Sequence, residues 1–356
     1  MSNDKAAERQ AKIDSIIKNL SSSAMGMDIL MKSLRASGLS LMNIIDSGKF
    51  PTVTDPERLA NAKKGVVLDT ETTGLDHKTD EVIELAMVEF TYDEYGILAL
   101  GRVYDEFNEP MKGPIPDEVV ALTGITNEMV KGHRIDPEEV KEIVGSISIV
   151  LAHNAAFDRK MCEANFPDCG FDNVDWHCTA NQVEWIMRGK NGRSLEVLAL
   201  SEGLVYGSHR ANSDCLATAF VLNSKDENGR SAFAEMLERG NVPSIFLIAE
   251  NAPFDRKDLL KDRGYRWAAD GSEAYGYKAW HKEIPGDEAS LAAEAEFMRT
   301  EVYKREVALP CYHVAAVSRY TDRKPGKKEF FRTAEVKSLE EASQQRNLEA
   351  EPTFDL

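Results

Sequence analysis

The spacing of apolar residues separates a helical beginning from a longer part of alternating strands and helices. Up to residue 47 the apolar positions recur every three to four residues, for example at Ile13, Ile17 and Leu20. That is the period of an amphipathic helix, so we predict an N-terminal helical segment over residues 1–47. Prolines and polar residues then predict a connector over residues 48–64.

From Gly65 onward, short apolar runs bounded by turn residues predict strands. Three runs, at residues 65–71, 81–93 and 97–109, are joined by short links in the manner of a meander. A fourth strand is predicted to end at Ala152, and segments with the 3.6-residue period predict helices just before that strand and at residues 155–166, 194–204 and 213–224. Strands covered by helices indicate an α/β fold with a mixed sheet flanked by helices, in which ligand sites lie at strand ends.

Turn-rich and charged stretches set the expected domain boundaries. The main domain is predicted over residues 65–226, and the polar, turn-rich stretch after it predicts a linker over residues 227–243. A small α+β module is expected over residues 244–322, beginning with the strand "SIFLIAE". Residues 323–356 are predicted to be a charged tail that is poorly ordered from residue 333 on.

The overall charge limits how the protein can meet nucleic acid. The 60 acidic residues outnumber the 43 basic ones and give a formal charge of −17. This argues against a protein that binds nucleic acid along a general basic surface, but not against an enzyme that binds one strand end. No apolar run approaches the roughly 18–20 residues that span a bilayer, and the first residues lack a secretory pattern. We therefore expect a cytoplasmic protein without a membrane partner.

The cysteines do not predict a metal or disulfide framework. All five are spread widely, without a CxxC pair. A zinc cluster could be drawn from Cys162, Cys169, His177 and Cys178, but the irregular spacing disfavours it. Buried thiols that behave as small apolar groups are the simpler expectation.

Two carboxylates lie at the end of the first predicted strand, in the stretch "VVLDTETTGL". Side chains alternate along a strand, so Asp69 and Glu71 point to the same side. Two like charges at such short range are unfavourable unless a cation lies between them. Considered alone, this pair fits a solvated strand end at least as well as a metal site.

Further polar residues at the ends of predicted elements favour the metal site. Asp158 lies in the first turn of a helix that follows an apolar strand, and His209 precedes Asp214 by five residues at the head of another helix. Carboxylates suit hard cations such as Mg²⁺ and Mn²⁺. Two such ions can activate a water and stabilise both oxygens of a displacement at phosphorus, while a neutral histidine takes the proton.

The motifs "LDTETTGL", "HNAAFD" and "HRANSD" resemble, in this order, the three motifs of the DEDDh (DnaQ-like) 3′-to-5′ exonuclease family. Members of this family include the epsilon proofreading subunit of bacterial DNA polymerase III. Residues 115–132 also resemble the family's segment between the first two motifs, and the resemblance covers about residues 65–225. It implies a ribonuclease H-like fold, two divalent ions and hydrolysis of phosphodiester bonds from a 3′ end.

The resemblance also implies a role for each site residue. Asp69 would bridge both ions, Glu71 and Asp214 would complete the ion on the nucleophile side, and Asp158 would hold the second ion. His209 would be the general base.

The same resemblance implies residues that contact the substrate. Around the first motif and the second motif, the residues that would cradle the last nucleotides are Thr70, Thr72, Gly74, Leu75, Asn154 and Phe157. For His153, a structural hydrogen bond is a better expectation than a catalytic role.

Outside these motifs the sequence leaves alternatives open. Residues 254–280 interleave cations with aromatic residues, a mixture that can bind single-stranded nucleic acid or simply form the core of a small domain. The N-terminal helices could pack on their own domain, and either they or the C-terminal module could bind a protein partner or self-associate. The basic run at residues 323–332 fits a phosphate contact or a solvated surface equally well.

We therefore expect a metal-dependent 3′-to-5′ exonuclease that releases nucleoside monophosphates from single-stranded or frayed DNA. An exoribonuclease that trims RNA is the first alternative, because the motifs do not decide the sugar. A non-catalytic tethering subunit of a nucleic-acid complex is the second, although it would be expected to lack a motif carboxylate. A role in DNA repair or proofreading is a further hypothesis.

Overall fold

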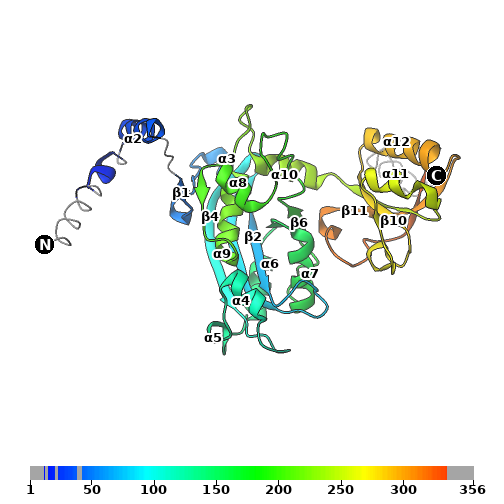
Figure 1. Ribbon diagram of the computed structural model, residues 1–356, viewed down its shortest axis with the longest axis horizontal. Helices are drawn as coiled ribbons and strands as arrows, with labels where there is room; N and C mark the ends of the chain where they lie inside the picture. Colours follow the sequence, from blue (N-terminus) through cyan, green and yellow to red (C-terminus); the bar gives the residue numbers. More distant parts are fainter. Residues whose placement is uncertain (1–11, 13–14, 21–22, 38–41, 335–356) are drawn as a thin grey trace, which may run out of the picture.

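The computed structural model describes residues 12, 15–20, 23–37 and 42–334, and Figure 1 shows two separate sheets along its length. The first is a mixed five-stranded sheet of order β4-β3-β2-β5-β6. Its strands are β2 (Lys63–Thr72), β3 (Val82–Asp93), β4 (Gly96–Phe107), β5 (Ile149–Ala152) and β6 (Asp175–Cys178). β2 pairs antiparallel with β3 and parallel with β5, so the meander and the parallel half meet at β2. The predicted α/β fold, ribonuclease H-like in strand order, is confirmed.

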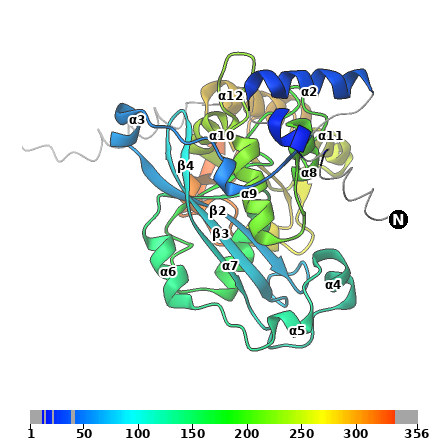
Figure 2. The same cartoon turned by 90° about the vertical axis from the view of Figure 1, so that its left-hand side faces the viewer.

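Helices cover both faces of this sheet because β2 and β3 are apolar on both sides. Val67 belongs to a core shared with the helices α8 (Leu195–Ser201), α9 (Ala211–Leu222) and α10 (Ala232–Asn241). Its neighbours Val66 and Leu68 belong to the opposite core, shared with α6 (Pro137–Gly145) and α7 (Ala155–Asn165). Figure 2 shows α9 crossing the sheet on the first of these faces. The short helices α3 (Pro56–Ala60), α4 (Asp117–Thr123) and α5 (Asn127–Val130) complete this domain.

The stretch predicted to be a linker over residues 227–243 is instead part of this domain. Its residues 232–241 form α10, whose Phe233 ring lies 5.9 Å from that of Phe90 and 5.4 Å from that of Tyr92. At Gly240 a Cβ atom would lie 2.0 Å from Nδ1 of the buried His177, so only glycine allows this helix to approach β6 so closely. The prediction failed because the turn residues before the helix dominate the sequence pattern, so the apolar positions of the helix were not recognised.

The second sheet builds the C-terminal module, in the order β12-β11-β8-β10-β9. Its strands are β8 (Ser244–Ala249), β9 (Arg266–Trp267), β10 (Trp280–Pro285), β11 (Ala308–Val314) and β12 (Glu329–Arg332). The helices α11 (Lys257–Asp262) and α12 (Glu288–Phe297) pack on one face of it. From β8 to β11 the chain order is strand-helix-strand-strand-helix-strand, with β8 between β11 and β10, as in a ferredoxin-like split unit, and β12 adds a fifth strand beside β11.

β12 corrects the prediction that the charged tail begins at residue 323. Residues 329–332 pair with β11, and the buried Phe331 joins the module's core, so the module continues past residue 322. Residues 335–356, the rest of the predicted tail, lie outside the described residues.

The N-terminal segment also differs from its prediction in part. α2 (Ala24–Ala36) is helical, but Ile44 belongs to the short strand β1 (Asn43–Ile44), which pairs with β7 (Leu204–Val205). Ile16, Ile17, Met25 and Ile29 are exposed rather than packed on the sheet domain. Among the described residues, no helix combines the length and apolar character that crossing a bilayer requires.

A strap at residues 315–323, between β11 and β12, joins the module to the first domain. Arg159 of α7, which is fully buried, donates hydrogen bonds to the carbonyl oxygens of Val317 and Arg319 at 2.8 Å each. The buried Arg319 in turn donates to the Gly240 carbonyl at 2.5 Å and to the Glu283 carboxylate at 2.7 Å. Two buried guanidinium groups therefore link α7, the strap, α10 and the second sheet.

We predict that Arg159→Met lowers the free energy of unfolding by about 2–4 kcal/mol, because it leaves buried carbonyl oxygens without donors. Urea unfolding followed by tryptophan fluorescence measures this effect. The matched control is Arg102→Met, which removes an exposed guanidinium paired with Glu139, and should cost less than about 1 kcal/mol. Equal losses for both variants would contradict a structural role for the Arg159 contacts.

Candidate active site

Three carboxylates converge at the end of β2. Oxygen atoms of Asp69, Glu71 and Asp214 lie within 4.8 Å of one another. Asp69 and Glu71 alternate with Thr70 along the strand, so both point to the face that α9 covers, and α9 supplies Asp214 in its first turn. Within the described part of the chain, this is the group of acidic, histidine or cysteine side chains whose spacing suits a metal ion. The alternative zinc cluster of cysteines and His177 is not among such groups.

Asp158 approaches the same place from the opposite face of the sheet. It lies in the first turn of α7 and is buried, and its Oδ1 accepts hydrogen bonds from the Thr70 backbone N–H at 3.1 Å and hydroxyl at 2.9 Å. Because Thr70 points away from Asp69 and Glu71, Asp158 lies on the other side of the strand from Glu71 and Asp214. The strand end is thus bordered by carboxylates on both sides.

Burial and mutual repulsion make these acids hold protons unusually tightly. The pKa of Asp69 is raised well above its ordinary value by burial and by the nearby charges of Asp158 and Asp214. Burial and Asp214 raise the pKa of Glu71 to about 8, and burial also raises the pKa of Asp158 and of Asp214. All carboxylates of such a cluster can be ionised at neutral pH when bound cations neutralise their charge. The donor set, all oxygen, fits Mg²⁺ or Mn²⁺.

His209 lies on the loop that leads into α9. Its backbone has a φ of 62°, the left-handed region that non-glycine residues seldom adopt. Its ring is 44% exposed and its Nε2 lies 4.0 Å from Glu196 Oε1, so the imidazole is open to solvent next to the cluster. Asp214 accepts a hydrogen bond from the Tyr206 hydroxyl at 3.2 Å and from the Arg210 backbone N–H at 3.2 Å.

The predicted substrate residues around the first motif lie at the end of β2 and in the loop after it. Thr70 and Thr72 are buried and use their hydroxyls internally, Thr72 donating to the Gly74 carbonyl at 2.6 Å. Leu75 is 86% exposed. His77 and Lys160 both contact Asp322 of the strap, at 2.8 and 2.7 Å, so the C-terminal module is connected to this loop.

In the second motif, Asn154 directly precedes α7, its backbone carbonyl accepts from the Phe157 N–H at 2.7 Å, and Phe157 packs against the core beneath the helix. His153 uses both ring nitrogens: Nε2 donates to the Arg193 carbonyl at 2.9 Å, which leaves Nδ1 to accept from the Thr179 hydroxyl at 2.8 Å. This arrangement agrees with the structural role expected for His153. The roles of the other substrate residues stay predictions.

The sequence analysis missed a second layer of charges behind the cluster. Glu84 of β3 is opposite Glu71 in the sheet and is fully buried, and Arg210 pairs with it at 2.7 Å. Nearby Asp105 of β4 has its pKa raised to about 6 by burial and by Glu84. The available signal was Glu84, the single acid within the apolar run "VIELAMV", which a strand buried on both faces tolerates only with a partner.

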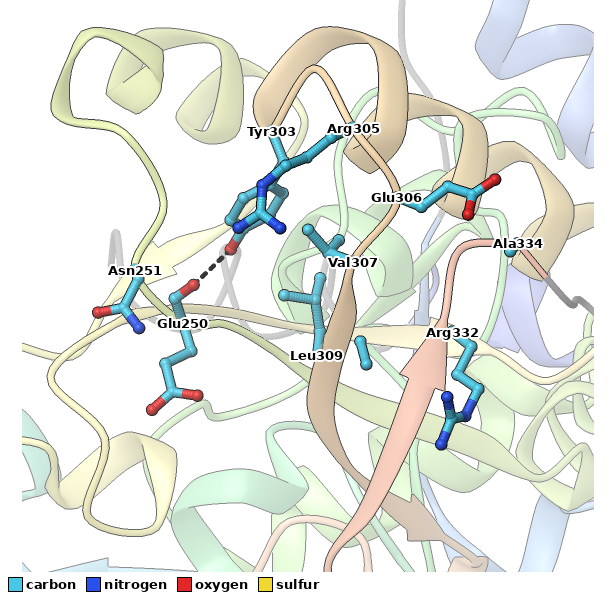
Figure 3. A pocket seen from close by; sticks show the side chains of 10 residues that line it. Glu250, Asn251, Tyr303, Arg305, Glu306, Val307, Leu309, Arg332 and Ala334 are labelled. Carbon is cyan, nitrogen blue, oxygen red and sulfur yellow. Dashed lines mark hydrogen bonds between the residues drawn. The ribbon is translucent and has the colours of Figure 1, made fainter.

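A separate pocket lies in the C-terminal module, away from these acids (Figure 3). It is lined by Glu250, Asn251, Tyr303, Arg305, Glu306, Val307, Ala308, Leu309, Arg332 and Ala334. The Tyr303 hydroxyl donates to the Glu250 carbonyl at 2.7 Å across it. Its acidic and basic side chains are mixed, so its charge selects neither anions nor cations.

Residues 66–222 match the family model described as exonuclease. They form an exonuclease domain of that family. Over 201 residues the chain is 28% identical to DNA polymerase III PolC-type of Lacticaseibacillus paracasei, covering 54% of this chain and 13% of that protein. The Staphylococcus aureus protein of the same name is 29% identical over 217 residues, with 52% and 14% covered. The chain thus spans about one seventh of these relatives' length.

Solved structures similar to this chain include Exonuclease X in complex with 5′ overhanging duplex DNA. That likeness has 24% identity and a TM-score of 0.37, and it covers 49% of this chain and 99% of the other. E. coli Exonuclease I in complex with a dA16 oligonucleotide has 14% identity and a TM-score of 0.40, covering 72% of this chain and 64% of the other.

We predict that Asp69→Asn stabilises the metal-free exonuclease domain at alkaline pH. Carboxylates with raised folded pKa values stabilise the protein below their unfolded pKa of about 4, and this contribution is lost as pH rises through the folded pKa values. At pH 8 in EDTA, Asp69→Asn should raise the melting temperature by about 2–6 °C, or roughly 1–2 kcal/mol. The difference should shrink toward zero near pH 4.5.

The same melting experiment with added Mn²⁺ tests the metal site. Mn²⁺ should raise the melting temperature of the unaltered protein and do so much less for Asp69→Asn. Glu142→Gln, which removes an exposed acid of α6, is the control and should behave like the unaltered protein. A metal-free Asp69→Asn protein that melts below the unaltered one at pH 8 would refute the charge-repulsion argument.

Proposed function

We propose that the chain is a metal-dependent 3′-to-5′ exonuclease that releases nucleoside monophosphates from single-stranded or frayed DNA ends. The observation that carries this proposal is the approach of Asp69, Glu71 and Asp214 to within 4.8 Å in a domain of the exonuclease family. Asp158 and His209 border the same strand end. Together they are the residue types that hydrolysis of a phosphodiester requires.

The carboxylates would divide between two cation sites. Asp69 has Asp158 on one side and Glu71 and Asp214 on the other, so it would contribute to both sites. Glu71 and Asp214 would complete the site on the α9 face. Asp158 has committed Oδ1 to Thr70, which leaves Oδ2 as its metal-binding oxygen. Divalent ions bound there would lower the pKa of a water and neutralise charge on the scissile phosphate.

His209 would act as the general base. Its exposed imidazole lies beside the α9 side of the cluster, where it can take the proton of the attacking water as the oxygen bonds to phosphorus. The bond from phosphorus to the 3′ oxygen of the remaining strand then breaks, and that oxygen leaves with a proton from solvent. The products are a nucleoside 5′-monophosphate and a strand one nucleotide shorter.

DNA is the favoured substrate because the relatives that match this domain are named as DNA polymerases. The exposed Leu75 beside the cluster is available to pack against the terminal base. A role in proofreading or repair of DNA ends would follow from this substrate.

The test is a digestion of matched single-stranded DNA and RNA labelled at the 5′ end, with Mg²⁺, Mn²⁺ or EDTA. We expect a metal-dependent ladder that shortens from the 3′ end of DNA, and a loss of at least about 1,000-fold for Asp69→Asn. Release of labelled mononucleotide at the first time point would indicate the opposite polarity, and faster loss of RNA would identify an exoribonuclease. A protein that binds Mn²⁺ but cuts neither strand would refute the proposal.

A second variant separates the general base from the metal ligands. His209→Gln should lower kcat by about 100- to 10,000-fold, because it removes a general base. Its Mn²⁺ affinity, measured by calorimetry, should stay within about threefold of the unaltered protein's, because His209 is not among the converging metal ligands. An equal loss of kcat and Mn²⁺ affinity would instead make His209 a metal-site residue.

A further inference from the structure

The loop that carries His209 is fastened to the sheet through its neighbour Arg210. The Arg210 guanidinium donates to both oxygens of Glu84, with Nη2 2.7 Å and Nε 3.1 Å from Oε1 and Nε 3.3 Å from Oε2. Glu84 Oε2 also accepts from the Ala211 backbone N–H at 3.0 Å. One carboxylate therefore holds both the side chain of Arg210 and the first residue of α9.

Glu84 is a rigid anchor for this contact. Its side chain is 1% exposed, and it lies in β3, hydrogen-bonded between β2 and β4. In the register of the sheet it is opposite Glu71, and side chains directly opposite each other point to the same face. The Arg210 guanidinium also lies 5.4 Å from the centre of the Phe107 ring on β4. Glu84, which anchors the His209 loop, and the predicted metal ligand Glu71 therefore lie side by side on neighbouring strands.

His209 needs such an anchor because, within the described part of the chain, no hydrogen bond holds its ring. Its Nε2 is 4.0 Å from Glu196 Oε1, which is too long for a hydrogen bond. Its left-handed backbone, with φ 62°, is a conformation that persists only where the surrounding structure imposes it. On the C-terminal side, that constraint comes from Arg210 and Ala211 through Glu84, and from the Arg210 N–H through Asp214.

We propose that Glu84 and Arg210 are positioning residues that hold His209 over the carboxylate cluster. They act through His209 and contact neither the metal nor the substrate. This inference rests on the proposed function only for its catalytic consequence. The contacts of Arg210 and Ala211 with Glu84, which we call the clamp, are present without metal or substrate. They are therefore tested separately.

The first experiment measures the clamp without activity. Hydrogen exchange of backbone amides in residues 206–212 is followed by mass spectrometry in EDTA, for the unaltered protein, Arg210→Met and the control Arg102→Met. Loss of the Glu84 contact should speed exchange in this segment by about tenfold or more, and the control should leave it unchanged. Unchanged exchange in Arg210→Met overturns the clamp, whatever the enzyme does.

The second experiment is a double-mutant cycle on exonuclease activity. Arg210→Met should lower kcat by about 10- to 100-fold with KM within about twofold, since displacing a catalytic group by an ångström has effects of this size. In a His209→Gln background the same substitution should cost less than about twofold, because the residue through which it acts is gone. Arg210→Lys, which keeps a cation for Glu84, should recover part of the lost kcat.

Two outcomes of the cycle overturn the proposal. A raised KM with unchanged kcat would make Arg210 a substrate contact, and equal losses in both backgrounds would make it independent of His209. Because Arg210→Met leaves Glu84 buried without its cation, the double variant Glu84→Gln with Arg210→Met is measured alongside it. If that variant keeps full kcat and slow exchange, positioning is refuted without any question of misfolding.

An unaltered protein that digests no strand in the preceding assays would refute the proposed function. The exchange measurement would still decide whether Glu84 and Arg210 fix the loop. The two failures are therefore distinguishable.

Discussion

The concentration of negative charge at the end of β2 is the constraint on which the rest of this structure depends. Asp69, Glu71 and Asp214 approach within 4.8 Å, and Glu84 and Asp158 lie just behind them. Repulsion at such distances opposes folding unless cations, protons or guanidinium groups compensate it. Burial, together with this repulsion, raises the pKa of Asp69 and of Glu71. Divalent ions would remove it, which couples metal binding to the stability of the domain.

The sheet makes this concentration possible because β2 is central and buried on both faces. Alternate residues of β2 face two different helices. Asp214 of α9 therefore lies on one face of the sheet and Asp158 of α7 on the other. The strand end is also the point where the antiparallel meander meets the parallel half of the sheet. Chain segments from both halves therefore reach one place, as expected for ligand sites in open α/β sheets.

The C-terminal module is attached to the helix that carries one of these acids. Arg159 follows Asp158 directly and donates to the strap, and Glu163 on the same helix accepts from Thr321 at 2.6 Å. Asp322 of the strap reaches Lys160 and His77. Its side chain is 47% exposed, so these two pairs add little stability compared with the buried guanidinium contacts. What they add is a connection between the module and the loop that follows the first motif.

The sequence by itself determined the first strands of the sheet and the acids of the three motifs, but not Glu84 and Asp105 behind them. β2, β3 and β4 lie within two residues of their predicted bounds, because apolar runs between turn residues are local signals. The placement of Asp69, Glu71, Asp158, His209 and Asp214 at element ends was also readable from local pattern. The motifs added the family, which the match over residues 66–222 supports.

Only the tertiary structure decided which residues hold the site in place. The partners Glu84 and Arg210 are 126 residues apart, and Arg159 and Arg319 are 160 apart, so no periodicity along the chain could pair them. α10 and β12 escaped prediction for a related reason: each lies in a turn-rich or charged stretch, and its apolar residues find their partners on another element. Local pattern reports which side chains are apolar or charged, whereas burial and pairing depend on segments that meet only after the chain has folded.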